Sequence, residues 1–249
     1  MSREHHSGNL PSSDQQIVKE RYEMITEVIP SNTDKEFIKA KKDFQEKEAN
    51  STGLITEPTE LFDEKKLQTV IQSRIKDSRE VMNILKTLSN TDARLFLGGG
   101  IIRNLVWDYL HGYKNSTPIE DVDVVYFDSL SNTKEHDKAL EKNLEELVPN
   151  YKWSVKNQAR MHIFNEENEY QSLEDAISKW PETATAIAVR LHDDGQIEIV
   201  APYGFTDLFR LLVIPTPHFY KKLHKYKERL ANKNWVKNWP KLRFVNIEE

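Results

Sequence analysis

Apolar residues recur at helical spacing in three stretches of the chain. The first stretch predicts one core-facing helix that ends at the turn "SNTD", and its apolar positions are Leu67, Val70, Ile71, Ile75, Val81, Met82, Leu85 and Leu88. The second stretch predicts a helix over residues 101–111 that ends at Gly112. The third predicts a helix over residues 135–147 that stops before Pro149.

Between these helices, short runs rich in β-branched and aromatic residues predict strands. They are "RLFL", the run that begins at Val122, "YKWSV", "ARMHIF", "TATAIAVRL" and "QIEIV", the last two joined by the turn "HDDG". A short helix is expected around residues 173–179. Strands alternate with helices at first and pair as a hairpin later. The pattern therefore favours an α/β or α+β fold with a mixed sheet flanked by helices.

The flanks differ from this central part. Residues 1–66 are rich in charges of both signs and predict a partly helical N-terminal extension. Residues 67–217 form the predicted main domain. Residues 218–249 are dominated by Lys and Arg, with Trp235 and Trp239 near the end. This tail predicts either an amphipathic helix that packs on the domain through Leu223, Tyr226 and Leu230, or a segment that contacts RNA.

Composition narrows the class of protein. The chain has 249 residues, 38% of them hydrophobic and 30% charged, and a net charge of -5. No run is apolar enough for a membrane span or a secretory signal, so we expect a cytoplasmic protein without membrane contact. The absence of cysteine excludes disulfides, thiolate metal sites and a cysteine nucleophile.

Two carboxylates stand two residues apart in the strand "EDVDVVYFD". Since side chains alternate across a strand, Asp121 and Asp123 share one face while Val122 and Val124 share the other, with Cβ atoms roughly 6–7 Å apart. Two acids this close favour an oxygen-seeking divalent cation between them, Mg²⁺ first and Mn²⁺ as the alternative ion. The competing interpretation is a strand end whose acids simply meet solvent.

A glycine turn lies upstream, in "FLGGGIIRN". Gly98, Gly99 and Gly100 let the backbone approach a bound group, and the helix that follows presents free N–H donors to phosphate. The dinucleotide fingerprint would need a glycine at Arg103, and the P-loop needs a GK[ST] that the chain lacks. The other interpretation is that the glycines only permit close packing of the strand on the helix.

The order of strand, glycines, helix, loop and Asp-x-Asp strand resembles the DNA polymerase β-type nucleotidyltransferase superfamily, especially the head domain of tRNA CCA-adding enzymes. It is more closely similar to a bacterial nucleotidyltransferase-like family first catalogued as a domain of unknown function. The resemblance runs from about residue 67 to 243, through "GGGIIRNLVWDYLHG", "DVDVVYFD", "VKNQARMH", "WPETATAIAVRL", "APYGFTDLF" and "WVKNWPKL". It implies the nucleotidyltransferase fold.

The resemblance also implies roles for individual residues. Gly98 and Gly99 would hold the triphosphate of a nucleotide, and Asp121 and Asp123 would coordinate two Mg²⁺ ions. The superfamily uses a third carboxylate on a neighbouring strand. Glu198 in "QIEIV" is the first choice for it, because Ile197 and Ile199 would face the core, and Asp207 is the competitor.

Further nucleotide contacts are expected from Arg103 and Asn104 on the helix after the glycines. CCA-adding enzymes carry Arg-Asp there, so contacts with the nucleotide sugar do not transfer to the neutral Asn104. Arg160 and His162 in "ARMHIF" would share a face of their strand and stabilise a leaving pyrophosphate or contact an acceptor, or else fix a strand end.

The expected function is Mg²⁺-dependent transfer of a nucleoside monophosphate from a nucleoside triphosphate to an unidentified hydroxyl or amine acceptor. The acceptor is a small molecule, a protein or RNA. The alternative is a nucleotide-binding or RNA-binding module on the same fold with little turnover. A glycosyltransferase would explain the Asp-x-Asp pair but would leave the glycines unexplained.

Overall fold

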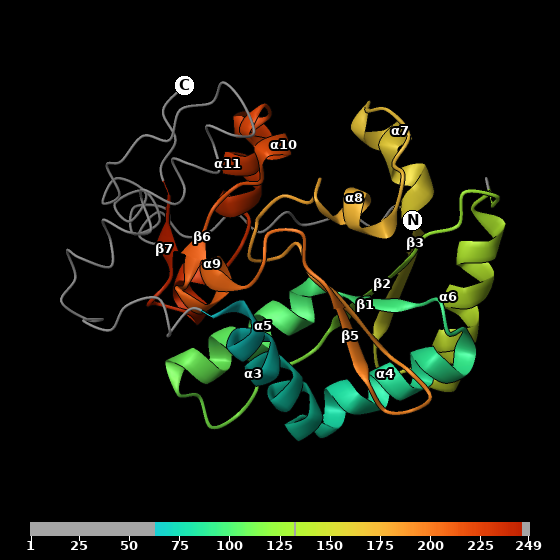
Figure 1. Cartoon of the computed structure of the whole chain (residues 1–249), viewed down its shortest axis with the longest axis horizontal. Helices are drawn as coiled ribbons and strands as arrows, with labels where there is room; N and C mark the ends of the chain where they lie inside the picture. Colours follow the sequence, from blue (N-terminus) through green and yellow to red (C-terminus); the bar gives the residue numbers. More distant parts are fainter. Residues whose placement is uncertain (1–62, 132, 246–249) are drawn as a thin grey trace, which may run out of the picture.

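A five-stranded mixed sheet lies at the centre of the protein, in the order β3-β2-β1-β4-β5 (Figure 1). The computed structural model describes residues 63–131 and 133–245, so the predicted N-terminal extension lies almost wholly outside the described residues. β2 and β3 are parallel, and the other neighbours are antiparallel. The bounds are β1 (Phe96–Gly98), β2 (Asp121–Tyr126), β3 (Lys152–Asn157), β4 (Ala188–Leu191) and β5 (Ile197–Val200). The predicted mixed sheet is confirmed.

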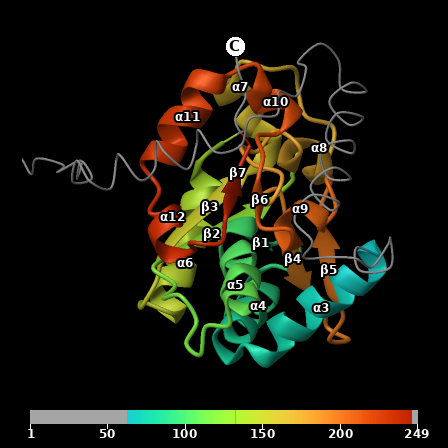
Figure 2. The ribbon, with the colours of Figure 1, turned by 90° about the vertical axis from the view of Figure 1, so that its left-hand side faces the viewer.

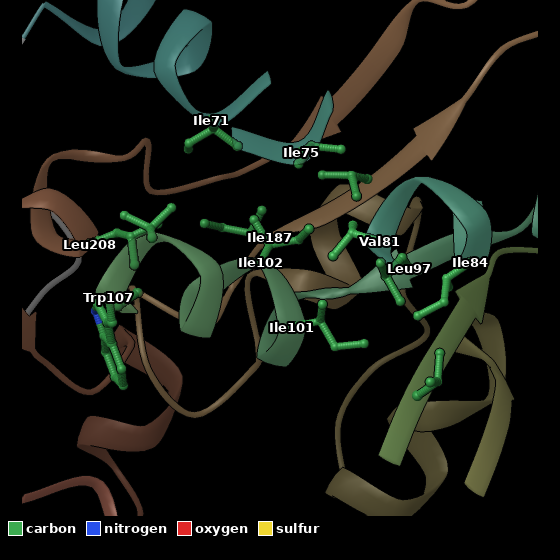
Figure 3. Close-up of a cluster of buried hydrophobic side chains, with 14 of the residues drawn as sticks. Ile71, Ile75, Val81, Ile84, Leu97, Ile101, Ile102, Trp107, Ile187 and Leu208 are labelled. Atoms are coloured by element: carbon green, nitrogen blue, oxygen red, sulfur yellow. The ribbon is translucent and has the colours of Figure 1, made fainter. Parts of the chain in front are cut away.

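Four longer helices pack on one face of this sheet: α3 (Glu64–Asp77), α4 (Arg79–Thr91), α5 (Gly99–His111) and α6 (Glu135–Leu147). Their apolar side chains meet Leu97, Val124 and Val189 of the sheet in the main core. Figure 3 shows Ile71 and Ile75 of α3 above Ile101 and Ile102 of α5, with Ile187 between them. Burying these side chains fixes which face of β2 points away from the core.

The other face of the sheet carries a smaller apolar cluster of Phe96, Val125, Ile177, Ala186 and Ala188. Figure 1 shows α7 and α8 on this side. The remaining short elements are η2 (Gln158–Arg160), α7 (Met161–Asn165), α8 (Leu173–Ile177), α9 (Thr206–Phe209), β6 (Leu212–Val213), α10 (Pro217–Tyr220), α11 (Leu223–Ala231), α12 (Trp235–Asn238) and β7 (Arg243–Phe244). β6 and β7 form a separate parallel pair, which the sequence pattern did not predict.

Two predicted elements are wrong. The single helix over residues 67–88 is two helices, because Ser78 is extended and its hydroxyl caps α4 by accepting from the Val81 N–H at 3.3 Å. The predicted strand "ARMHIF" is η2 followed by α7. There the side chain of Asn157 accepts from the Ala159 N–H at 3.1 Å and turns the chain out of the sheet.

The C-terminal segment, residues 218–245 of the described chain, packs on α5 through its tryptophans. Trp235 and Trp239 lie edge-on to Trp107, with ring centroids 5.4 and 5.2 Å away. The Trp239 indole N–H also donates to Asp108 at 2.8 Å, and Figure 2 shows α12 at the side of α5. Both tail tryptophans are buried, so neither offers a free ring on which an RNA base could stack.

Within the described parts of the chain, no helix is both long and apolar enough to cross a membrane.

Candidate nucleotide site

Asp121 and Asp123 project from the face of β2 that points away from the main core. Val122 and Val124 point to the opposite face and are fully buried, while both aspartates are exposed. This is the alternation that the sequence predicted. Asp121 also forms an ion pair with Lys152 of β3, at 3.1 Å between Oδ1 and Nζ, but both side chains are well exposed. Such a pair contributes about 0–1 kcal/mol and yields readily to another ligand.

The glycine turn lies directly beside Asp123. A Cβ built on Gly98 would stand 3.2 Å from the Cβ of Asp123 and 3.1 Å from its carbonyl oxygen. Gly98 ends β1, and α5 begins at Gly99 without a side-chain cap. The first N–H groups of a helix have no acceptor within the helix, so this end of α5 presents donors beside the two acids.

The three glycines serve different purposes. A Cβ on Gly99 would lie 2.1 Å from the carbonyl oxygen of Thr185 and 2.7 Å from that of Ile187, so no side chain fits there. Gly99 therefore permits close packing of α5 on the loop before β4. Nothing lies within 4 Å of a Cβ on Gly100. Gly100 is the glycine that leaves space over the start of α5.

A cavity of about 800 Å³ opens in front of these groups. Gly98, Gly99, Gly100, Asp121 and Asp123 all line it. A cavity of this size falls within the range of small-molecule sites. The structure thus brings together the glycine turn and the two aspartates, which lie more than twenty residues apart in the sequence.

Arg103 and Asn104 line the same cavity. Arg103 is buried, with its guanidinium 4.9 Å from the Trp107 ring and 4.4 Å from the Trp235 ring. It donates to Asn104 Oδ1 at 2.8 Å and to Thr185 Oγ1 at 3.1 Å. Burial lowers the pKa of Arg103 to about 10, which leaves it charged at neutral pH. The side chains to which it donates are neutral, and the carboxylates of Glu182 and Asp123 are near enough to oppose the lowering of its pKa.

Arg160 and His162 do not line the cavity. Arg160 is buried in an ion pair with Asp137 and also donates to backbone carbonyls of the loop before α6. The ring Nδ1 of His162 lies 2.7 Å from the carbonyl oxygen of Ala159. The helical turn at residues 158–165 breaks the alternation that would have placed both side chains on one face. These contacts of Arg160 hold the loop before α6 against the segment that follows β3.

Neither candidate for the third carboxylate joins the aspartates. Glu198 lies on β5, with β1 and β4 between it and β2, which is three strand spacings or about 14 Å. Its carboxylate accepts from Arg190 at 2.6 Å and lies 2.9 Å from His192. Asp207 is buried and accepts from the Thr183 hydroxyl at 2.6 Å.

The strands next to β2 place other residues beside the two acids. In the register of β3, Lys152 faces Asp121, Ser154 faces Asp123 and Lys156 faces Val125. Among the described residues, no group of three or more acids and histidines is arranged to hold a metal ion. Two carboxylates still suit Mg²⁺, which proteins commonly bind through one or two carboxylates together with substrate phosphates. The donor set at β2 fits one such ion.

Several residues of the cavity were not predicted as part of a site. Tyr170, Trp180 and Phe219 are aromatic residues of its lining, and Arg229 and Lys233 add positive charge. Short motifs gave no signal for them, because they come from loops and helices far along the chain. The Lys- and Arg-rich tail is the one sequence feature that points to these cations, but its composition alone indicates only a basic surface.

A cleft that combines a helix start, a glycine turn, paired acids and a buried arginine is typical of proteins that bind a phosphorylated ligand. The model of a family described as nucleotidyltransferases matches residues 88–244. An NMR structure that reveals "a CCA-adding enzyme head domain" matches with 35% identity and a TM-score of 0.63, over 71% of this chain and 94% of that one. The chain belongs to the nucleotidyltransferase family. The family, the fold and the class of enzyme expected from the sequence are confirmed.

More distant likenesses extend to longer enzymes. A CCA-adding enzyme in complex with ATP has 14% identity and a TM-score of 0.47, over 72% of this chain and 43% of that one. A tRNA nucleotidyltransferase with a primer tRNA and an incoming ATP analog has 20% identity and a TM-score of 0.36, over 63% and 52%. The chain thus spans about half or less of the length of these enzymes. No curated protein sequence matches it.

Proposed function

We propose that the protein is a Mg²⁺-dependent nucleotidyltransferase that moves a nucleoside monophosphate from a nucleoside triphosphate to a hydroxyl or amine acceptor. The observation that carries this proposal is the close approach of Gly98 to Asp123, whose Cβ would lie only 3.2 Å from a Cβ built on Gly98, at the wall of a cavity of about 800 Å³. The uncapped start of α5 and the two acids therefore face the same space.

The start of α5 supplies the phosphate-binding part of the site. Its free N–H groups and the positive end of the helix dipole favour an anion. The space above Gly100 lets the phosphates come close to the backbone. Arg103, held between Trp107 and Trp235, adds a fixed positive charge next to these donors. These groups would orient the triphosphate along the glycine turn.

Asp121 and Asp123 would hold the magnesium ion, which would supply neutralisation of the triphosphate charge and Lewis-acid polarisation of a phosphoryl oxygen. In the reaction, the acceptor oxygen or nitrogen bonds to the α-phosphorus and gives up its proton to solvent, and the bond from this phosphorus to the oxygen of the departing pyrophosphate breaks. The residues of β2 and α5 would keep these atoms in line. The acceptor is a small molecule, a protein or RNA, with exposed lysines of α11 as the surface for an RNA.

The test is label transfer from α-labelled nucleoside triphosphates in the presence of Mg²⁺ and a fractionated cell extract. Asp121→Asn and Asp123→Asn should each lower transfer at least about a hundredfold, because charge stabilisation at the phosphate is lost. Both residues are exposed, so the free energy of unfolding should change by no more than about 0.5 kcal/mol. Asp193→Asn, in the exposed turn after β4, is the matched control. Undiminished transfer by Asp123→Asn would refute the proposal.

A second candidate function is nucleotide binding without transfer. It is favoured by one observation, the lack of a third acid beside Asp121 and Asp123 in the described part of the chain. It predicts that nucleoside triphosphate binds with Mg²⁺ and is recovered intact, without release of pyrophosphate. Measured pyrophosphate release that depends on Asp123 would exclude this alternative.

A further inference from the structure

The C-terminal segment reaches into the nucleotide cavity as well as packing on α5. Arg229 lies in the last turn of α11, and Lys233 lies in the link between α11 and α12. Both line the cavity together with Arg103, the glycine turn and Asp123. One wall of the cavity is therefore built from cations that lie more than a hundred residues after the acids in the chain.

Specific contacts hold this wall in place. Arg229 donates to the two carboxylate oxygens of Glu182 at 2.6 and 3.3 Å, and Glu182 is fully buried. The guanidinium of Arg229 also lies 5.8 Å from the ring of Trp235. Trp235 in turn packs on Trp107 and Arg103. The link that carries Lys233 is thus anchored at both ends, by the ion pair of α11 and by the tryptophan of α12.

Lys233 has no counterion of its own among the described residues. Its side chain forms no hydrogen bond or ion pair with any residue in ranges 63–131 and 133–245, although the residue is only partly exposed. Burial lowers the pKa of Lys233, the charges of Arg229 and Arg103 lower it further, and Glu182 and Asp123 act in the opposite direction. Glu182 is already paired with Arg229. Three cations, Arg103, Arg229 and Lys233, thus lie near the two carboxylates of Glu182 and Asp123, and this excess of positive charge favours an anion.

The arrangement selects a ligand with several linked negative charges. Asp121 and Asp123 repel an anion unless a cation lies between, whereas Lys233, Arg103 and Arg229 attract it directly. A polyphosphate can satisfy the acids and the cations at once. One phosphate can share a cation with Asp121 and Asp123, while a terminal phosphate contacts the basic side chains of Lys233, Arg103 and Arg229.

We propose that Lys233, backed by Arg103 and Arg229, binds the terminal phosphates of the nucleoside triphosphate and the pyrophosphate product. The identity of the ligand rests on the proposed function. Binding itself requires no transfer, so pyrophosphate can be used as the probe. The C-terminal segment is then part of the phosphate site of this chain, which neither the family match nor the Asp-x-Asp motif specifies.

The test is the binding of inorganic pyrophosphate to the full chain in EDTA, measured by isothermal titration calorimetry at low salt. Lys233→Gln should weaken binding about tenfold or more, as expected for the loss of one charge-assisted contact. Lys237→Gln, an exposed lysine on α12, is the matched control and should change affinity less than twofold. Lys233→Arg should retain most of the affinity, because it keeps the charge.

A second variant, Asp123→Asn, should change the pyrophosphate affinity in the opposite direction. Asp123→Asn removes repulsion near Lys233 and should tighten metal-free pyrophosphate binding, even though the same variant should lower transfer at least about a hundredfold. Equal affinities for Lys233→Gln and Lys237→Gln would overturn the inference, and so would a wild-type chain that binds no pyrophosphate. A Lys233→Gln effect on a short RNA oligonucleotide but not on pyrophosphate would also overturn it. Failure of transfer with normal pyrophosphate binding would count against the proposed reaction alone.

Discussion

Gly99 and Gly100 at the start of α5 have different roles that can be tested separately. Gly99 permits close packing of α5 on the loop before β4, and Gly100 leaves space for a ligand. Gly99→Ala and Gly100→Ala add the same methyl group to the same helical turn. On Gly99 the new Cβ would lie 2.1 Å from the Thr185 carbonyl oxygen and 2.7 Å from that of Ile187. On Gly100 it would meet nothing within 4 Å.

The expected free energies follow from these distances. Ordinary contact with a Cβ begins at about 3.4 Å, so Gly99→Ala forces the backbone of α5 or of the loop at residues 185–187 to move by more than an ångström. Such overpacking costs about 3 kcal/mol, at the upper end of the usual range. Gly100→Ala restricts the unfolded chain and should stabilise the protein by about 0.5–1 kcal/mol.

Urea denaturation of the full chain measures both changes, and a thermal scan should show a shift of about 2–4 °C per kcal/mol for a protein of this size. Nucleoside triphosphate affinity is measured on the same samples. Gly100→Ala should bind the nucleotide several-fold more weakly although it is more stable, because its methyl group occupies the space over the helix start.

Two results would refute this reasoning. Equal stabilities for the two variants would contradict the close packing of Gly99 on Thr185. Unchanged nucleotide affinity in Gly100→Ala would show that the phosphates do not lie at the start of α5.

The remaining predictions concern residues outside the cavity wall. Asp137→Ala should destabilise the protein by about 3–5 kcal/mol in urea denaturation, because it leaves Arg160 charged and buried without its partner; a loss below 1 kcal/mol would contradict this role. Glu198→Gln should leave label transfer within twofold of wild type, since β1 and β4 separate it from the acids, and a large loss would restore it as a third carboxylate. Burial and the neighbouring Lys222 lower the pKa of His218 below its usual 6.5, while Glu167 opposes the shift. The unfolded chain therefore takes up this proton first, so the free energy of unfolding should fall as pH drops from about 7 to 5, and His218→Asn should flatten that slope.

The paired acids and the glycine turn were predictable because local rules govern them. Alternation along β2 fixes the face of Asp121 and Asp123 once Val122 and Val124 enter the core. A strand that ends in glycines and is followed by a helix predicts a tight turn, and the first N–H groups of that helix have no acceptor within it. The motif order then identified the family.

The third carboxylate could not be placed in the same way. Alternation along β5 correctly places Glu198 on the face that points away from the main core, because Ile197 is buried in that core. The distance between Glu198 and Asp123 depends instead on strand order, and β5 proves to be the edge strand beyond β4. Pattern analysis of single strands contains no information on that order.

The sequence pattern did not predict that Arg229 and Lys233 line the cavity, for a related reason. The contact of Trp239 with Asp108 spans 131 residues, and it directs the basic tail onto α5. A run of lysines looks the same in a sequence whether it faces solvent or a cavity. Only the packing of Trp235 and the ion pair of Arg229 with Glu182 decide that Lys233 lines the site.

The central claim is that Asp121 and Asp123 and the start of α5 bind one nucleoside triphosphate between them. A crystal of the full chain grown with Mn²⁺ and a non-hydrolysable nucleoside triphosphate tests it most directly, through the anomalous signal of the manganese. The account predicts a manganese peak within coordination distance of the Asp121 and Asp123 carboxylates, with the phosphates over Gly100. A nucleotide bound elsewhere on the protein, or phosphates at the glycine turn with no contact between metal and aspartates, would contradict it.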